Sequence, residues 1–238
     1  MTTSDRFTAA MESVSLTRVP ASDLSRPFVE LFPVTGTAVS TIGDLLGSET
    51  VSASDARAAR LDELQFDLGV GPCWDALHSA EPVLEPDLRN RPRRVWPVFS
   101  ETVARDGIRS LFAFPMLVGP LKIGAIDMYA EAPTELDAEA TGQATALAGV
   151  VARQILQQAL AEAGSEYTED VSNPFSRRII HQATGMVLAQ LGVDASDARL
   201  VIQGHAFAAG RSMMEVAQDI LERRLDFSNR QGEIEDSE

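Results

Sequence analysis

The sequence has one cysteine and almost no lysine. Cys73 is the single cysteine in 238 residues, which excludes an intramolecular disulfide, a paired-thiol redox centre and a zinc site built on several cysteines. Lys122 is the single lysine among 20 basic residues, and all the others are arginine. Any contact with phosphate would therefore fall to guanidinium groups, which bind phosphate oxygens in a bidentate manner.

Several targeting and catalytic signals are also missing. No apolar run approaches the roughly 18 residues of a membrane-spanning helix, and the N-terminus (MTTSDRFTAAMESVS) lacks the basic and apolar regions of a secretory signal. We therefore expect a cytoplasmic protein that does not bind membrane. Phosphate-loop, dinucleotide-binding, serine-hydrolase and zinc-protease motifs are absent, and the three histidines (His78, His181 and His205) are scattered. We expect no enzyme and no dedicated metal site, and the residues identify no cofactor.

The charge is acidic and uneven. Acidic residues outnumber basic ones by 35 to 20, and residues 1–173 carry 25 of those acids against 13 basic residues. Residues 174–228 are balanced, with six of each. Because nucleic-acid binding is normally accompanied by a basic excess, electrostatics alone does not predict it here. The hydrophobic fraction of 45% is that of a chain with a packed core, in one large or two small domains.

The first 163 residues read as a mixed sheet domain. Residues 1–20 are polar without a sustained period and are expected to be a flexible N-terminus. Residues 109–118 and 121–130 are apolar on both faces and predict two central strands joined at Gly119-Pro120. Elsewhere in this part we expect short strands in 35–46 and 49–53, a helix from Asp55 to about Gln65, and a surface loop over 82–97 that carries Arg89, Arg91, Arg93 and Arg94.

Helices dominate the rest of the chain. Residues 135–163 contain no proline and keep a helical apolar spacing, so we predict one long helix whose far end packs against a second chain. Residues 164–173 are expected to be a linker. Residues 174–228 show three amphipathic stripes, with Gly192 placed to end the first helix and a Ser212-x-x-Glu215 capping box starting the third. The domain boundaries are thus 21–163 and 174–228, followed by an acidic tail over 229–238.

Residues 178–217 resemble the ANTAR domain, a three-helix RNA-binding module of bacterial antitermination regulators. The resemblance rests on Ala183-x-Gly185, Gly192, Ala198 and Val216-Ala217. Residues 22–160 resemble the GAF sensor domain that often precedes it, through the run Leu64 to Cys73 together with Asp87-Leu88, Trp96-Pro97, Arg109-Ser110 and Gly124-Ala125. The expected fold is therefore an α/β (α+β) GAF-like sheet domain, a long helix and an all-α bundle.

The resemblance implies a homodimeric transcription antitermination regulator. It would bind structured hairpin RNA through the ANTAR helices, under control of the GAF domain, and dimerise through residues 135–163 and the ANTAR helices. Thr184 stands where the family usually has Lys, and Ile202-Gln203 stands where it usually has Leu-Arg. An alternative therefore remains open, in which the module serves ligand sensing, dimerisation or contact with RNA polymerase without binding RNA.

Six residues are the candidate RNA contacts, because RNA recognition needs cations for phosphates and side chains that reach unstacked bases: Arg177, Arg178, His181, Thr184, Arg199 and Arg211. For an arginine the alternative is a solvated helix face, and for His181 and His205 it is a structural role. Gly185 inside a helix indicates close approach of another helix or of RNA, and we favour helix packing.

Four residues are the candidate sensor positions: Cys73, Trp74, Trp96 and Asp127. Cys73 follows a Gly-x-Gly-Pro turn and could begin a helix, where a thiol pKa falls and a redox sensor is conceivable; the alternative is a small buried residue. The tryptophans are candidates for a pocket floor or for ordinary core. Asp127, a lone acid in an apolar strand, is the candidate polar group of a GAF-type cavity, unless it caps a loop.

Overall fold

The computed structural model describes residues 3–16, 19–43, 45–90, 95–163, 177–230 and 233–237. The chain divides into two compact units, Met1–Phe175 and Ser176–Glu238. The predicted linker over 164–173 lies outside the described residues, as do Phe175 and three arginines of the predicted 82–97 loop, Arg91, Arg93 and Arg94.

The first unit is built on a five-stranded antiparallel sheet in the order β2-β1-β5-β4-β3. The strands are β1 (Gly36–Thr41), β2 (Glu49–Ala53), β3 (Val83–Glu85), β4 (Ser110–Val118) and β5 (Leu121–Ala130). The two predicted central strands are confirmed as β4 and β5, which form a hairpin closed by Gly119 at φ 58°. Gly124 of β5 admits no side chain, because a Cβ there would lie 1.9 Å from the Ser40 carbonyl oxygen of β1.

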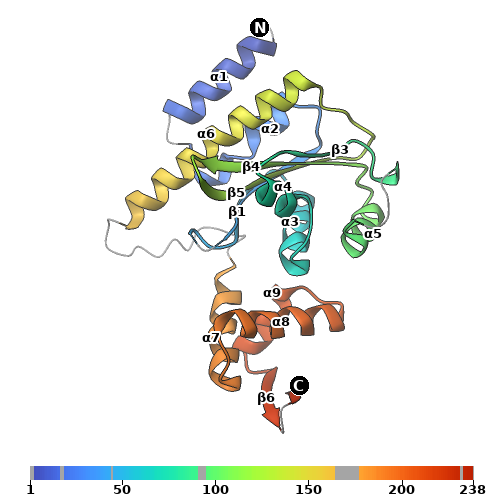
Figure 1. Ribbon diagram of the computed structural model, residues 1–238, viewed down its shortest axis with the longest axis vertical. Helices are drawn as coiled ribbons and strands as arrows, with labels where there is room; N and C mark the ends of the chain where they lie inside the picture. The colour runs from blue at the N-terminus through green and yellow to red at the C-terminus, as the bar shows by residue number, and fades with distance from the viewer. Residues whose placement is uncertain are drawn as a thin grey trace. The chain divides into compact units, whose positions relative to one another are not determined.

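Helices cover both faces of this sheet (Figure 1). On one side lie α1 (Thr3–Leu16), α2 (Arg26–Leu31) and α6 (Ala138–Ala163), and on the other α3 (Ala56–Leu68), α4 (Pro72–Ser79) and α5 (Pro97–Arg105). Two short 3₁₀ turns, η1 (Ala21–Asp23) and η2 (Leu88–Asn90), complete the unit. The 82–97 segment thus holds β3 and η2 as well as loop.

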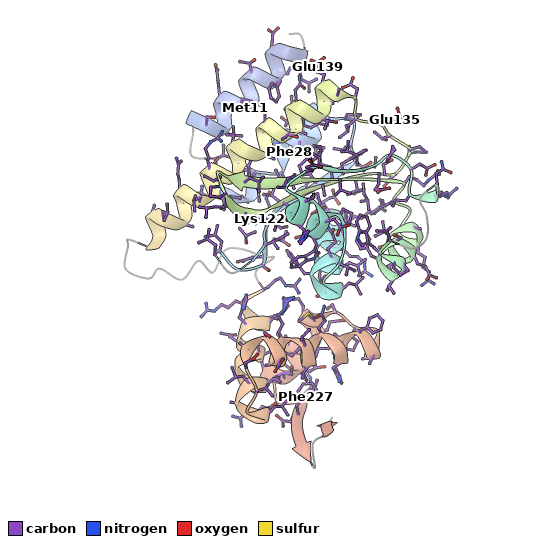
Figure 2. The ribbon with its side chains drawn as sticks, viewed as in Figure 1. Met11, Phe28, Lys122, Glu135, Glu139 and Phe227 are labelled. Carbon is purple, nitrogen blue, oxygen red and sulfur yellow. The ribbon has the colours of Figure 1, made fainter. Side chains whose placement is uncertain are left out.

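The period of two along β5 divides its side chains between the two faces. Ile126 and Met128 join the core beneath α6, with Phe28, Leu147 and Val151. Figure 2 shows Phe28 on the same side of the sheet as α6. Ala125 packs with Phe66, Cys73 and Leu77 on the opposite face, where Asp127 also belongs by strand alternation.

The expectation of a flexible N-terminus is wrong for residues 3–16, which form α1. Phe7, Met11 and Val14 recur at helical spacing and pack into the core that includes α6, and Val14 is 2% exposed. Figure 2 places Met11 between α1 and α6. The sequence of this segment has a polar composition because its few apolar residues occupy a single face of the helix. Tertiary packing buries that face.

The second unit contains the three predicted helices, α7 (Arg178–Leu191), α8 (Ala195–Ala209) and α9 (Met213–Leu221). Gly192 ends α7 in the left-handed conformation at φ 67°, and the Ser212–Glu215 capping box starts α9. The core consists of residues from all three helices, including Ala183, Val187, Ile202, Val216 and Ile220.

The chain after α9 is more ordered than an acidic tail. It forms a two-stranded antiparallel hairpin of β6 (Asp226–Arg230) and β7 (Glu233–Ser237). Phe227 anchors β6, since it is 5% exposed and its ring meets that of His205 at 5.6 Å. Gln190 of α7 holds the same strand: its amide nitrogen donates to Asp226 at 2.7 Å and its oxygen accepts from the Phe227 amide at 3.2 Å.

Candidate nucleic-acid interface and sensor core

The exposed residues of α7 repeat at helical spacing and form one continuous face. Three of its members carry polar side chains and three are small or apolar: Arg178, His181, Gln182, Gly185, Leu188 and Ala189. The opposite side of the helix is buried, with Ile180, Ala183, Val187 and Leu191 in the core. We call the six exposed residues the α7 face.

Gly185 lies in the middle of the α7 face. A Cβ built on this glycine would meet nothing within 4 Å. No other helix of the described bundle packs against Gly185, so the close approach of a helix or of RNA that we expect there would have to come from another molecule. The surface above it is open to a ligand or to a second molecule.

Two of the predicted RNA contacts are buried. Arg177 is 7% exposed and sits at the N-cap of α7, where its carbonyl accepts the amides of Ile180 at 2.9 Å and His181 at 3.3 Å. Thr184 is 9% exposed, and its hydroxyl donates to the Ile180 carbonyl at 2.7 Å. This is the local bond that a hydroxyl on a helix makes to the preceding turn, so Thr184 presents no hydroxyl to a ligand.

A third predicted contact, Arg211, bonds within the bundle. Its guanidinium lies 2.5 Å from the Asp219 carboxylate, which also pairs with Arg224. Hydrogen bonds from Arg211 and then Arg224 lower the pKa of Asp219 below its usual value. The positive charge of Arg211 is therefore opposed locally. Of the remaining candidates, Arg178 and His181 lie on the exposed α7 face, and Arg199 is half-buried on α8.

The candidate sensor residues Cys73 and Asp127 lie in one buried polar cluster. The Cys73 amide donates to Oε1 of Gln65 at 2.9 Å, and the Trp74 indole donates to the Gln65 carbonyl at 3.0 Å. Burial raises the pKa of the Asp127 carboxyl well above its usual value, the charge of Asp62 raises it further, and the nearby Gln65 side chain, whose Nε2 makes no hydrogen bond among the described residues, opposes the shift. Asp127 is therefore a candidate for a carboxyl that stays protonated at pH values well above the usual pKa of an aspartate.

Asp62 is held differently from Asp127. It is fully buried on α3, and its carboxylate accepts the hydroxyls of Ser40, at 2.5 Å, and Thr50. Asp62 and Asp127 are thus two buried acids in one core, a composition that is common at ligand and proton sites.

The Cys73 thiol is a poor redox group in this setting. It does lie in the first turn of α4, as the sequence suggests, but it is 0% exposed. Burial raises the pKa of the thiol well above its usual value, and the charges of Asp127 and Asp62 raise it further. The geometry favours the alternative of a small buried residue.

The two tryptophans do not share a pocket. Trp74 packs edge-on against Phe66 at 6.2 Å, near Cys73. Trp96 belongs to a different cluster, edge-on to Phe99 at 6.0 Å, with a left-handed backbone at φ 47°. Trp96 is thus core, and only Trp74 of the pair adjoins the polar cluster.

An open groove of about 860 Å³ lies elsewhere, at the ends of β3 and β5. Its described lining includes Glu85, Asp87, Asn90, Thr134 and Glu135. Asp87 pairs there with Arg109 at 2.9 Å, and the hydrogen bond from Arg109 lowers the pKa of the carboxyl. None of the four candidate sensor residues lines this groove.

Asp62 and Gln65 were not identified from the sequence. Both lie on the buried side of α3 with Ala58, Leu61 and Phe66. A polar pair at the spacing of the apolar stripe was the available signal, because such residues face the core rather than solvent. Among charged neighbours such as Glu63 and Asp67, this signal is easily missed.

Comparison with known families matches both units. The GAF domain family matches residues 29–156, and the ANTAR domain family matches residues 175–221. This chain belongs to the GAF domain family. It carries an ANTAR domain after the GAF domain, in the order that the sequence predicts. No curated protein matches the chain.

Solved structures support the fold of the GAF domain. The GAF domain of a phosphoenolpyruvate-protein phosphotransferase from Coxiella burnetii is similar with a TM-score of 0.52 at 13% identity, over 68% of this chain and 96% of that one. A bacteriophytochrome from R. palustris is similar with a TM-score of 0.50 at 12% identity, over 84% of this chain and 46% of that one. The match to the chromophore-binding domain of that protein has a TM-score of 0.49 at 12% identity, and covers 66% of this chain but 61% of the domain. At these identities the two matches with TM-scores of 0.50 and 0.52 establish the fold alone.

GAF is a sensor domain and ANTAR an RNA-binding antitermination domain, and neither is a catalytic domain. The helices that the structure describes include none with the length and apolarity needed to span a bilayer.

Proposed function

We propose that this protein is a dimeric, cytoplasmic antitermination regulator that binds hairpin leader RNA through the α7 face, under control of its GAF domain. The observation that carries the proposal is the α7 face itself. Within a domain of an RNA-binding family, one helix presents Arg178, His181 and Gln182 beside a glycine with open space above it. This combination offers a cation for phosphate, and an imidazole and an amide for the edges of unpaired bases.

Dimerisation compensates for the small number of cations. Each copy contributes Arg178 from the α7 face and Arg199 from α8, so a dimer doubles both. For single strands each neutralised phosphate contributes a slope of about -0.7 to log K against log salt. A bundle without a basic excess can thus hold RNA with modest, salt-sensitive affinity.

Helix α6 is the proposed dimer contact of the GAF domain. Its 26 residues span roughly 39 Å at about 1.5 Å per residue. One side is buried against the sheet through Leu147, Val151 and Ile155. The exposed side carries Leu160 near its end, at 66% exposure. A second copy packing on this side would cover the leucine.

The polar cluster around Asp127 is the proposed place where the signal acts. Gln65 of α3 bonds Cys73 of α4 and lies beside Asp127 of β5, so a ligand or proton that changes the cluster would act on both helices. The burial of Cys73 disfavours a redox signal and leaves a small molecule, a proton or a partner.

A second candidate function is supported by a specific observation. Arg177 and Thr184 are buried, and Arg211 pairs with Asp219, so half of the predicted RNA contacts are buried or paired within the protein. The same burial and pairing of these residues is expected of an ANTAR domain that dimerises or contacts RNA polymerase without binding RNA. The two functions differ in whether RNA binds at all.

The test is binding of the full-length protein to a panel of synthetic RNAs with two hairpins joined by a single-stranded linker, at two salt concentrations. We expect salt-sensitive binding that weakens in Arg178→Gln. The control is Arg105→Gln on α5, an exposed arginine of the GAF domain that changes net charge equally. Absence of binding by a folded dimer would favour the second function.

A further inference from the structure

The outer surface of α8 carries two large apolar side chains that the bundle does not cover. Leu200 is 60% exposed and Phe207 is 62% exposed, on a helix whose other side is buried through Ala198, Ile202 and Ala206. Leu200, Gly204 and Phe207 follow one another at helical spacing of four and then three residues. A Cβ on Gly204 would meet nothing within 4 Å, so these three residues form a flat apolar surface two turns long, here called the α8 ledge.

We infer that Phe207 is a stacking platform for an unpaired base of the bound RNA. This inference rests on the proposed RNA binding and adds a residue to it that carries no charge. An exposed aromatic ring is a favourable surface for a nucleobase, because every base has a face that can stack on it. Gly204, one turn earlier on the same side, leaves room for that base or its sugar beside the ring.

The size of the α8 ledge favours a base over a second protein chain. An aromatic side chain presents about 150–250 Å² in full, so Leu200 and Phe207 together expose on the order of 200 Å². A stable protein interface needs roughly 800 Å² from each partner. The ledge is therefore too small to hold a dimer by itself, whereas one stacked base requires only a single ring.

Its charged surroundings also fit RNA. Arg199 lies next to Leu200 on α8, and Gln203 lies one turn before Phe207. The same helix thus carries a guanidinium for phosphate, an amide for a base edge and a ring for a base face. Phe207 would select unpaired loops over continuous duplex, because bases inside a duplex have no face available.

The test compares the full-length wild type with Phe207→Ala and Phe207→Trp on the two-hairpin RNA and on a duplex of the same length. We expect Phe207→Ala to weaken hairpin binding about 5- to 150-fold, the range that corresponds to loss of one stacked base. The duplex should be unaffected, the salt slope should stay the same because no charge is lost, and Phe207→Trp should restore binding. A loop base replaced by 2-aminopurine should change its fluorescence on binding to the wild type and not to Phe207→Ala.

The outcomes of this test distinguish failure of the stacking inference from failure of the proposed RNA binding. Wild-type binding that is undiminished in Phe207→Ala overturns this inference and leaves the proposed function standing. Absence of RNA binding by the wild type overturns both. A change of oligomeric state in Phe207→Ala, measured by sedimentation, would assign the ledge to a protein contact instead.

Discussion

The Arg211 guanidinium lies 2.5 Å from the Asp219 carboxylate, which joins the turn after α8 to α9. Arg224 bonds the same carboxylate from the far end of α9. Two arginines of the ANTAR domain therefore fix its packing, and both lie off the α7 face.

Replacing Arg211 should affect stability before it affects RNA. We expect Arg211→Ala to lower the melting temperature of the ANTAR domain by a few degrees, while RNA affinity measured well below that temperature changes less than in Arg178→Gln. The pair is partly exposed, so the effect is small. Circular dichroism follows this unfolding, since both tryptophans belong to the GAF domain.

This stabilisation should also depend on pH. The pKa of Asp219 is lowered from its usual 3.8 in the folded domain, so the pair stabilises the fold above that value and its contribution is lost as pH falls through the lowered pKa. The difference in melting temperature between wild type and Arg211→Ala should therefore vanish in strong acid. A difference that persists there would contradict the assignment.

Asp127→Asn should stabilise the GAF domain at neutral pH. Burial raises the pKa of Asp127 above its usual 3.8. The folded wild type is therefore most stable below pH 3.8, and its stability falls as pH rises through the raised pKa. An amide has no charge to bury, and we expect a gain of about 1–3 kcal/mol at pH 7. Urea unfolding followed by tryptophan fluorescence at several pH values measures it. Equal pH dependence in both proteins would contradict the account.

The Cys73 thiol should be inert in the native protein. It is 0% exposed, and burial raises its pKa, so a thiol-specific disulfide reagent should react with it far more slowly in buffer than in urea. The ratio of the two rates is the measurement. Rapid reaction of the folded protein would restore the redox alternative.

Leu160→Glu should weaken the dimer without unfolding the chain. The side chain is exposed on α6, so no buried contact is lost, but a carboxylate would face the partner. Sedimentation should show a shift toward monomer, and Val98→Glu on α5, at an exposed apolar residue on the other face of the sheet, provides a charge-matched control. A dimer that resists the Leu160 change would place the contact elsewhere.

The helices and central strands were predictable because their signals are local. Gly192 ends a helix and Ser212 with Glu215 starts one, and neither depends on the rest of the fold. The strands β4 and β5 are apolar along most of their length. Such signals survive in a single sequence.

The parts that were missed depend on tertiary contacts. Helix α1 gains its order by burying Val14 in the core that includes α6, and β6 by burying Phe227 beside His205. Likewise, the sequence predicts that Thr184 contacts RNA, whereas its side chain is buried and its hydroxyl donates to the Ile180 carbonyl. The spacing of residues shows which of them share one side of a helix. Which of those residues are buried depends on the elements that pack against the helix.

The most direct test of RNA binding by the α7 face uses Gly185. Because a Cβ there meets nothing within 4 Å, both Gly185→Ala and Gly185→Trp should fold, and Ala should gain up to about 1 kcal/mol of stability from helix propensity. We predict that Gly185→Ala retains hairpin RNA binding within a few-fold, while the indole of Gly185→Trp covers the face and reduces affinity at least about tenfold, or about 1.4 kcal/mol. RNA binding by a folded Gly185→Trp protein that equals the wild type would contradict the claim that RNA lies on this face.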